Sequence, residues 1–499
     1  MGCRPFCETN REAGMTLTQS SSRSATTRTA PPALVILVVS VAAFLASLDL
    51  FIVNIAFPDI RKAFGNADLS AMSWILNGYT IVFAALLNPA GRLGDRYGHR
   101  RIFLWGLAIF AVGSAACGLS VSFVMLVASR VIQAIGAAML MPSSLALLMA
   151  AVPASRRAAA VSKWSAMSGM AAALGPPVGG LLVELSWRWI FFVNLPLVLA
   201  ALIAGPLVLG DTKATGTGVP DLFGALSVVL GIGSLVWALI ELPEASGTAA
   251  AVVTASVIAV CAMALAVWRS LRHPSPAIDL AAVRVLPMWS SCVALLLFSA
   301  AFAAMLLGNV MFLTTVWHES PAVAGLFLSP SPAVVVIVSL TLTARLIDKI
   351  GVGTVAATGA VVYLFGIVIW LCRVGPEPDY LLDFLPAQLF TGAGVGLVMP
   401  SLAAVSGLTL PAHRWGSGSA LTNTARQLGT VLGTAVLTMI YHPGIDLTTV
   451  RQGWAFIAIA AGTSALIAAG LAAWSRSRTR RLPAGHLLHS VGEFVGSDG

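Results

Sequence analysis

Long apolar runs alternate with short polar stretches over most of the chain, from about Leu34 to Trp474. Fourteen of these runs approach or exceed the roughly 20 residues that a helix needs to cross a bilayer. The whole sequence is 58% hydrophobic and only 10% charged, which is more apolar surface than a soluble globular protein can bury. The pattern therefore predicts an all-α polytopic membrane protein with 14 transmembrane helices.

A short polar stretch between the second and third runs has a copy far downstream. Gly91-Arg-Leu-Gly-Asp-Arg-Tyr-Gly98 is matched in order by Ala344-Arg-Leu-Ile-Asp-Lys-Ile-Gly351, and the string Met-Pro-Ser occurs at both 141–143 and 399–401. Membrane transporters are often built from such repeats, with the substrate bound between them near the bilayer midplane. We predict two parallel six-helix bundles, at 34–209 and 287–474. A linker at 210–286 supplies two extra transmembrane helices.

The distribution of basic residues predicts the orientation. If the amino terminus is cytoplasmic, the cytoplasmic loops and tails contain most of the Lys and Arg residues, as the positive-inside rule requires. An even number of spans then places the tails 1–33 and 475–499 in the cytoplasm, and the first tail has the composition of a disordered segment. The net charge of +9 is explained by these loops, so we expect no nucleic-acid partner. We expect the protein in the plasma (inner) membrane.

Several motifs resemble those of a known family. The polar stretch resembles the signature between helices 2 and 3 of the major facilitator superfamily, and the central pair resembles the fourteen-helix drug:proton antiporter branch. The strings Trp187-Arg-Trp-Ile-Phe-Phe-Val-Asn194-Leu-Pro196 and Asn423-Thr-Ala-Arg426-Gln427-Leu-Gly429 resemble that branch as well. The resemblance implies the major facilitator fold and a proton-coupled antiporter that exports amphipathic small molecules, such as drugs, antibiotics or a secondary metabolite, by alternating access.

The resemblance also implies roles for two groups of residues. The polar stretch would form a cytoplasmic gate, in which Asp95 and Arg96 latch the two halves together; the gate residues are Gly91, Asp95, Arg96, Gly98, Arg100 and Arg101. The motif that distinguishes exporters from importers corresponds to Gly175, Pro176, Gly179 and Gly180. Small residues at this spacing also allow any two helices to pack closely, so the spacing alone leaves a purely structural role open.

Asp49 and Arg130 are the two most costly charged residues inside the apolar runs. A carboxylate at mid-helix costs about 2.5–3.5 kcal/mol on insertion scales unless it is protonated, paired or hydrated, and Asp49 lies deep in the first run. Arg130 lies in the fourth run with Gln133 one turn away, whereas the second half has Gln388 at the matching position. We predict that Asp49 and Arg130 couple transport to protons. The alternative is a structural role in bonds between helices.

Other polar residues within the runs are candidates for lining the cleft, although a lone polar residue in a helix more often bonds a neighbouring helix. The candidates are Trp74, Asn77, Gln133, Asn309, Gln388, Asn423, Arg426 and Gln427. Because Asp49 faces an excess of interior basic residues, we expect a neutral or weakly charged amphipathic substrate rather than a dication.

The sequence also bears on energy source and reaction class. It contains no Gly-x-x-x-x-Gly-Lys-Ser/Thr string for ATP, and its six cysteines form no metal or disulfide pattern. We therefore expect no enzyme, no cofactor and no metal, and a monomer whose partners are the lipid bilayer, protons and a small molecule. Two rival functions stay open: proton-coupled uptake of a nutrient, and a sensor on the same scaffold that transports nothing.

Overall fold

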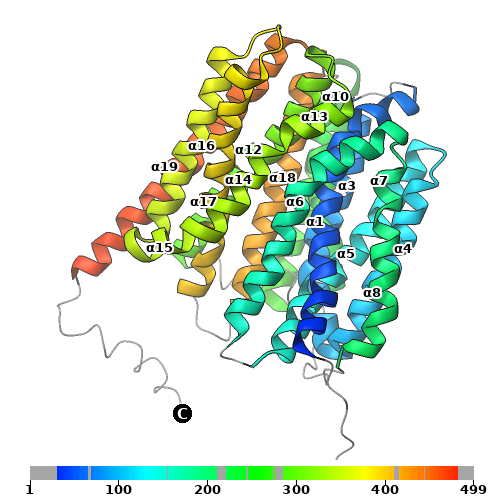
Figure 1. Ribbon diagram of the computed structural model, residues 1–499, viewed down its shortest axis with the longest axis vertical. Coiled ribbons are helices and arrows are strands. Elements are labelled where there is room, and N and C mark those ends of the chain that lie inside the picture. Colours follow the sequence, from blue (N-terminus) through cyan, green and yellow to red (C-terminus); the bar gives the residue numbers. More distant parts are fainter. Residues whose placement is uncertain are drawn as a thin grey trace, which may run out of the picture.

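The computed structural model consists of long helices (Figure 1). It describes residues 31–65, 69–153, 156–210, 221–242, 245–273, 276, 285–409, 415–442 and 444–481. Every regular element in these ranges is a helix, which confirms the all-α prediction. Most of the two predicted tails, namely 1–30 and 482–499, lies outside the described residues.

Among the described residues, the amino-terminal group contains six membrane-length rods. They are α1 (Pro32–Ala63), α3 (Trp74–Tyr97), α4 (His99–Gly118), α5 (Phe123–Ala151), α6 (Arg157–Leu185) and the consecutive α7 (Trp189–Phe192) and α8 (Asn194–Val208), with the short α2 (Leu69–Met72) before α3. Within this group α1 packs on α6, α3 packs on α5, and α4 packs on both α5 and α8. The group occupies the right of Figure 1.

The carboxyl-terminal group repeats this arrangement with more broken helices. Its elements are α12 (Leu286–Met311) with η3 (Phe312–Val316), α13 (Pro321–Leu328), α14 (Pro330–Val338), η4 (Ser339–Thr343), α15 (Ala344–Ile350), α16 (Val352–Arg373), η5 (Tyr380–Phe384), α17 (Leu385–Thr409), α18 (Trp415–Tyr441) and α19 (Leu447–Arg481). Two of the breaks follow the sequence, because Pro321 and Pro330 begin α13 and α14 and each lacks the amide hydrogen that a continuous helix would use. The domain boundaries inferred from the repeat stay a prediction.

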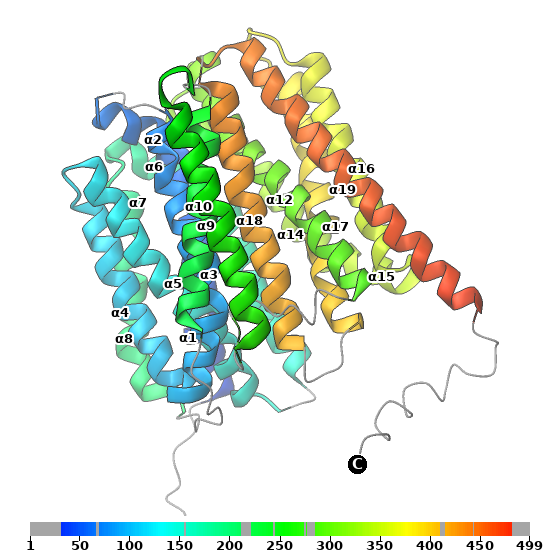
Figure 2. The same cartoon turned by 180° about the vertical axis from the view of Figure 1, so that it is seen from behind.

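The extra pair of helices covers the seam between the two groups. Figure 2 shows α9 (Leu222–Glu241) and α10 (Ala245–Arg272) in front of that seam, and α9 packs on both α3 and α18. Asp221 caps α9: its Oδ1 accepts a hydrogen bond from the Gly224 amide at 2.8 Å and pairs with Arg269 Nη2 of α10 at 2.8 Å. A cavity of about 520 Å³ lies between α9, α10 and Trp74, with Gly233 in its wall.

The two copies of the polar stretch adopt the same turn. α3 ends and α4 begins at Gly98, which has φ +94°, and α15 meets α16 at Gly351, which has φ +82°. Glycine suits both positions because other residues rarely adopt positive φ. These turns mark one side of the bundle, at the bottom of Figure 1, which we name the hairpin side; the other is the opposite side. The shared turn supports the duplication read from the sequence.

Eleven helices in the described part of the chain are long and apolar enough to cross a membrane. Three long rods remain: α3 and α18 fall below that hydropathy criterion, and α6 is apolar over the shorter described segment Met170–Leu185. All three lie where the two groups meet, because α18 packs on α3 and α6 packs on α13 and α14. Helices that face protein rather than lipid tolerate more polar side chains. The eleven spans and these three rods together make up the predicted set of fourteen.

Candidate functional site

The one acidic residue predicted within the first span lies at the centre of the amino-terminal group. The apolar sequence on both sides of Asp49 continues α1 without interruption, so the carboxylate is carried into the interior by the helix itself. Asp49 is 0% exposed. A carboxylate in such a place requires a compensating charge and hydrogen bonds.

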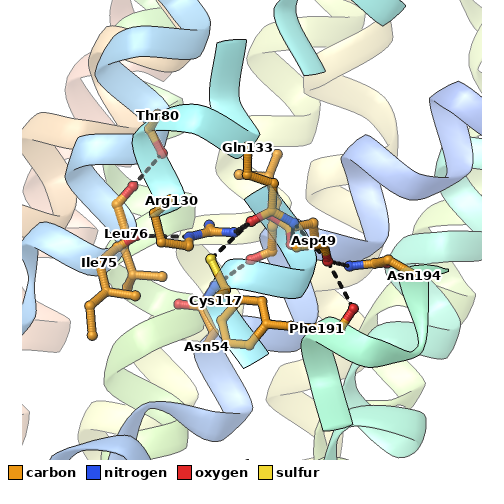
Figure 3. Close-up of polar contacts among 12 residues, drawn as sticks. Asp49, Asn54, Ile75, Leu76, Thr80, Cys117, Arg130, Gln133, Phe191 and Asn194 are labelled. Carbon is orange, nitrogen blue, oxygen red and sulfur yellow. Dashed lines mark hydrogen bonds and ion pairs between the residues drawn. The ribbon is translucent and has the colours of Figure 1, made fainter. Parts of the chain in front are cut away.

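The two predicted partners of this acid come from α5 (Figure 3). Nη1 of Arg130 forms an ion pair with Oδ2 of Asp49. Nε2 of Gln133 donates to Asp49 Oδ1 at 2.8 Å, and Gln133 Oε1 accepts from Arg130 Nη1 at 2.8 Å. Because residues three apart share one helix face, α5 presents both side chains to the same carboxylate. The structure thus brings together Asp49, Arg130 and Gln133 in one buried triad.

The guanidinium of Arg130 is also held by α3. Its Nε donates to the carbonyl oxygen of Ile75 at 3.1 Å, and its Cζ lies 4.2 Å from the centroid of the Tyr79 ring. An aromatic face stabilises a cation at this distance. Arg130 would therefore keep three neutral partners, namely Ile75, Tyr79 and Gln133, if the charge on Asp49 were removed.

A second layer of polar groups connects the triad to α4, α7 and α8. Ser114 Oγ of α4 donates to the carbonyl oxygen of Phe191 at 2.8 Å and accepts from Asn194 Nδ2 at 3.2 Å and Gln133 Nε2 at 3.4 Å. Cys117 Sγ donates to Gln133 Oε1 at 3.7 Å. Each polar atom of the Gln133 amide is therefore engaged twice, which fixes the orientation of the amide.

This second layer includes residues that were not among the predicted site residues. Ser114 and Cys117 are ordinary residues of an apolar run, and no sequence signal distinguished them. Asn194 lies inside the string that resembles the antiporter branch, and its position at the start of α8 was the available clue. His99 also received no role, although its spacing of four residues from Asp95 predicts a contact within one helix face.

The residues of the predicted exporter motif lie on α6, which packs between the two groups. A Cβ built on Gly175 would lie 2.7 Å from Phe51 Cβ of α1, and one built on Gly179 would lie 2.8 Å from Ile52 of α1. A Cβ on Gly180 would lie 2.5 Å from the carbonyl oxygen of Pro321, at the start of α13.

The carboxyl-terminal group also contributes a glycine to this contact between α6 and α13. A Cβ on Gly325 of α13 would lie 2.3 Å from the carbonyl oxygen of Pro176. Near this contact, Ser320 Oγ donates to Glu184 Oε1 at 3.5 Å. The motif therefore forms a backbone-to-backbone contact between the halves on the opposite side of the bundle.

The predicted gate residues lie on the hairpin side, and their described contacts are within the amino-terminal group. Asp95 Oδ1 lies 3.2 Å from His99 Nε2, and Arg100 Nη2 donates to the carbonyl oxygen of Pro206 at 2.7 Å. A Cβ on Gly91 would lie 3.5 Å from Pro142 Cβ. Arg96 lies over the ring of Tyr97, and Arg101 is exposed. The predicted latch between Asp95, Arg96 and the second half stays a prediction.

The remaining cleft candidates fall into separate places. Trp74 lines the cavity beside α9 and α10, and Asn77 Nδ2 donates to Ser73 Oγ at 3.5 Å. Asn309 Oδ1 accepts from Trp454 Nε1 of α19 at 3.3 Å, which holds it inside the carboxyl-terminal group. None of these three contacts joins the buried triad.

The candidates on α18 and α17 have different surroundings. Arg426 Nη2 donates to Asn423 Oδ1 at 3.2 Å, and Gln427 is 2% exposed. These residues share a polar face of α18 with Thr430, whose hydroxyl donates to the carbonyl oxygen of Arg426. Gln388 of α17 is 1% exposed, and its amide forms no hydrogen bond with the described residues.

Potential metal ligands occur in the described part of the chain as His, Cys, Asp and Glu side chains. Within the described residues, no three His, Cys, Asp or Glu side chains gather as metal ligands. The arrangement instead provides a buried carboxylate with a cation and an amide, which suits reversible protonation.

Comparison with known proteins agrees with this arrangement. The model of the Major Facilitator Superfamily matches residues 39–298 and 293–489. The chain is 32% identical over 407 residues to the multidrug resistance protein Stp of Mycobacterium tuberculosis (81% of this chain, 75% of Stp). It is 35% identical over 407 residues to the tetracenomycin C resistance and export protein of Streptomyces glaucescens (81% and 74%).

The chain is also similar to a third relative and to a solved structure. The multidrug efflux pump LfrA of Mycolicibacterium smegmatis is 32% identical over 464 residues (90% of each chain). The crystal structure of a D-xylose-proton symporter superposes with a TM-score of 0.62 at 15% identity, covering 87% of this chain and 96% of that one; this likeness concerns the fold alone. On the matched residues and the shared fold, the chain belongs to the Major Facilitator Superfamily.

Proposed function

We propose that the protein is a proton-coupled antiporter that exports amphipathic small molecules by alternating access. The observation that carries the proposal is the sealed triad of Asp49, Arg130 and Gln133 within a helix bundle. The relatives named for multidrug resistance, tetracenomycin C export and multidrug efflux support the direction of transport and the class of substrate.

The geometry couples proton binding to movement of the two halves through α1 and α6. A proton on Asp49 removes the charge that ties α1 to Arg130, while Arg130 keeps the Ile75 carbonyl, the Tyr79 ring and Gln133 Oε1. α1 is then free to shift against α5. Because α6 packs on α1 through Gly175 and on α13 through Gly180, a shift of α1 changes the contact between the halves.

The orientation follows from charge. We place the hairpin side in the cytoplasm, because Arg100, Arg101 and Arg269 lie there, and both termini with it. The close contact between α6 and α13 then closes the external side, and from this closure we infer an inward-facing conformation. This is the state in which an exporter takes up its substrate.

The charge of the cleft favours a neutral or weakly charged substrate. Asp49 is already neutralised by Arg130. Arg426 is partly buried on α18, and no described carboxylate lies within salt-bridge distance of it. A dication in this cleft would have no free acidic partner and would be repelled by Arg426.

The driving force is adequate for such export. One proton moving down about 100 mV releases about 2.3 kcal/mol. Since 1.4 kcal/mol corresponds to a tenfold ratio, this supports about a fiftyfold gradient of a neutral solute.

The test uses a strain that lacks its own efflux pumps and expresses the full chain. We expect the wild type to lower ethidium accumulation and raise resistance to a panel of antibiotics. Asp49→Asn abolishes both effects, because an amide cannot bind and release a proton and therefore cannot form and break the ion pair with Arg130. Asp383→Asn is the matched control, since Asp383 pairs with the exposed Arg373 at the edge of the bundle. Unchanged drug sensitivity in the wild-type strain across the whole panel would refute the export proposal.

Two outcomes would favour the rival functions. Proton-coupled uptake predicts that the wild type increases accumulation of a compound inside cells with an intact proton gradient. A sensor predicts binding of a compound by the purified protein without flux in liposomes. Collapse of the pH gradient and voltage with an uncoupler stops export in the antiporter and leaves binding by a sensor unchanged.

A further inference from the structure

The carboxylate of Asp49 is turned away from the seam between the two halves. Its partners come from α5, and the polar layer behind them comes from α4 and α8 (Figure 3). Phe51, two residues further along α1 and therefore on a different face, contacts Phe302 of α12 with ring centroids 6.3 Å apart. The carboxylate thus faces the interior of the amino-terminal half and is 0% exposed.

A series of polar groups extends from the opposite side of the bundle toward this carboxylate, and we name this series the polar path. Arg188 Nη2 donates to the carbonyl oxygen of Ser120 at 2.9 Å, just beyond the end of α4. Ser120 Oγ donates to the carbonyl oxygen of Cys117 at 2.8 Å. Ser114 lies one turn deeper and contacts Gln133, which contacts Asp49.

One atom on this path lacks a bonding partner among the described residues. Oδ1 of Asn194 is buried and accepts no hydrogen bond from them, although Nδ2 of the same amide donates to Ser114. Buried acceptors of this kind commonly bond to an ordered water. Ser114 has no further capacity, because its one hydrogen and both of its acceptor sites are in use.

From these observations we propose that protons reach Asp49 from the opposite side along the junction of α4, α7 and α8. This route is separate from the substrate cleft. Ser114 and Asn194 are positioning residues in it: Asn194 holds the water next to the path, and Ser114 holds the Gln133 amide against the carboxylate. The inference rests on the proposed antiport, because it assigns the route by which the exchanged proton enters.

The proton step is balanced within the triad. A hydrated proton gives up its hydrogen to a carboxylate oxygen of Asp49, one O–H bond forms, and a neutral water remains. The net charge of Asp49 and Arg130 rises from zero to +1. The ionisable groups that face Asp49 are Arg130 of α5, Tyr79 of α3 and Cys117 of α4. Glu184 of α6 bonds to Ser320 instead, and the described side chains of α7 and α8 include no ionisable group.

The test measures protonation of Asp49 directly. Dicyclohexylcarbodiimide crosses membranes and modifies buried carboxyl groups in their protonated form, and mass spectrometry reads the modification of Asp49. Right-side-out vesicles expose the opposite side to the medium, and everted vesicles expose the hairpin side. With the lumen held at pH 8, we expect modification to follow the pH of the medium in right-side-out vesicles. Because the antiport cycle releases the proton to the cytoplasm, everted vesicles show the exchange from the hairpin side, and a cross-link that holds the external side closed isolates the external route.

Substitutions along the path provide the second arm. Ser114→Ala frees the Gln133 amide and weakens its bond to the ionised carboxylate, so labelling at a given external pH increases by up to about tenfold. Asn194→Leu slows labelling at a given external pH about tenfold, as expected for a lost water contact. Ser114→Thr keeps the hydroxyl and restores the wild-type profile. Thr391→Val in the second half is the control, since Thr391 is equally buried but bonds only locally, to the carbonyl oxygen of Gln388.

A cross-link separates this route from the cleft. Glu184→Cys and Ser320→Cys, joined by a short thiosulfonate cross-linker, hold the external side closed. Labelling that still follows external pH in the cross-linked protein supports a separate route, and loss of that response places the route in the cleft and overturns the proposal. Profiles unchanged by Ser114→Ala and Asn194→Leu, in proteins that elute as folded monodisperse particles, also overturn it. Because labelling requires no transported compound, a failure to export ethidium leaves this test valid.

Discussion

The contact between α6 and α13 predicts that a single methyl group will shift the protein toward its outward-open conformation. In Gly325→Ala the new Cβ would lie 2.3 Å from the carbonyl oxygen of Pro176. Ordinary contact begins near 3.4 Å, so the helices must separate by about 1 Å (3.4 − 2.3). A backbone oxygen cannot rotate away as a side chain can, and overpacking of this kind costs about 1–3 kcal/mol.

The cost applies only to the conformation that contains this contact. The equilibrium between inward-open and outward-open forms therefore shifts by about 5- to 150-fold toward the latter, since 1.4 kcal/mol is tenfold. The assay is pulsed electron resonance between spin labels at Val121→Cys and Glu377→Cys, two exposed positions on the opposite side. We expect the longer-distance population to increase in Gly325→Ala.

The control is a substitution of similar severity within one half. In Gly394→Ala the new Cβ would lie 2.5 Å from Tyr363 Cβ, so it strains the carboxyl-terminal group without separating the halves. We expect lower thermal stability and an unchanged distance distribution. If both variants moved the distribution equally, or if neither did, the contact would not be the external closure and our account of the conformation would be wrong.

Three further predictions concern the triad and the extra pair. Arg130→Lys loses the planar fork that reaches Asp49 and its neighbours together, and we expect the initial rate of ethidium efflux to fall at least about tenfold. Burial raises the pKa of Asp221, but its hydrogen bonds to Arg269 and the Gly224 amide outweigh this and lower the pKa below its usual value. The stabilisation is therefore complete above the unfolded-state pKa and is lost as pH falls through the folded-state pKa. Thermal melts in detergent between about pH 6 and pH 3 will show this loss of stability, and the Asp221→Asn variant will lose less stability over the same pH range. Gly233→Leu places its side chain in the cavity, where a Cβ meets nothing within 4 Å, and it replaces a helical glycine. We expect the free energy of unfolding to stay unchanged or to rise by up to about 1 kcal/mol, which a thermal melt will show as an unchanged or higher melting temperature.

Much of the fold follows from simple patterns in the chain. Apolar length defined the helices, and the repeated polar stretch located Gly98 and Gly351, whose matching positive φ values reflect one turn used twice. The breaks in the second half, at η3, η4 and η5, were not predicted, because a π-helical turn changes hydrogen bonding without changing the apolar pattern.

The site was only partly accessible from the sequence. Asp49, Arg130 and Gln133 were identified because a charge in an apolar run is costly and because spacing placed two of them on one face. Their mutual contact, and the direction in which Asp49 points, depend on the rotation of α1 against α5. That rotation is set by the packing of Phe51 and Ile52 on neighbouring helices, which no local pattern encodes.

Asp49 is the fully buried carboxylate within the membrane-spanning helices of the described chain, and this has an electrical consequence. If Asp49 carries the exchanged proton, each cycle moves one positive charge inward at this site. Export of an uncharged compound then transfers net charge and responds to membrane voltage as well as to the pH difference. Export of a monovalent cation is electrically silent and responds to the pH difference alone. The currents measured with the two kinds of compound therefore report the stoichiometry of the pump.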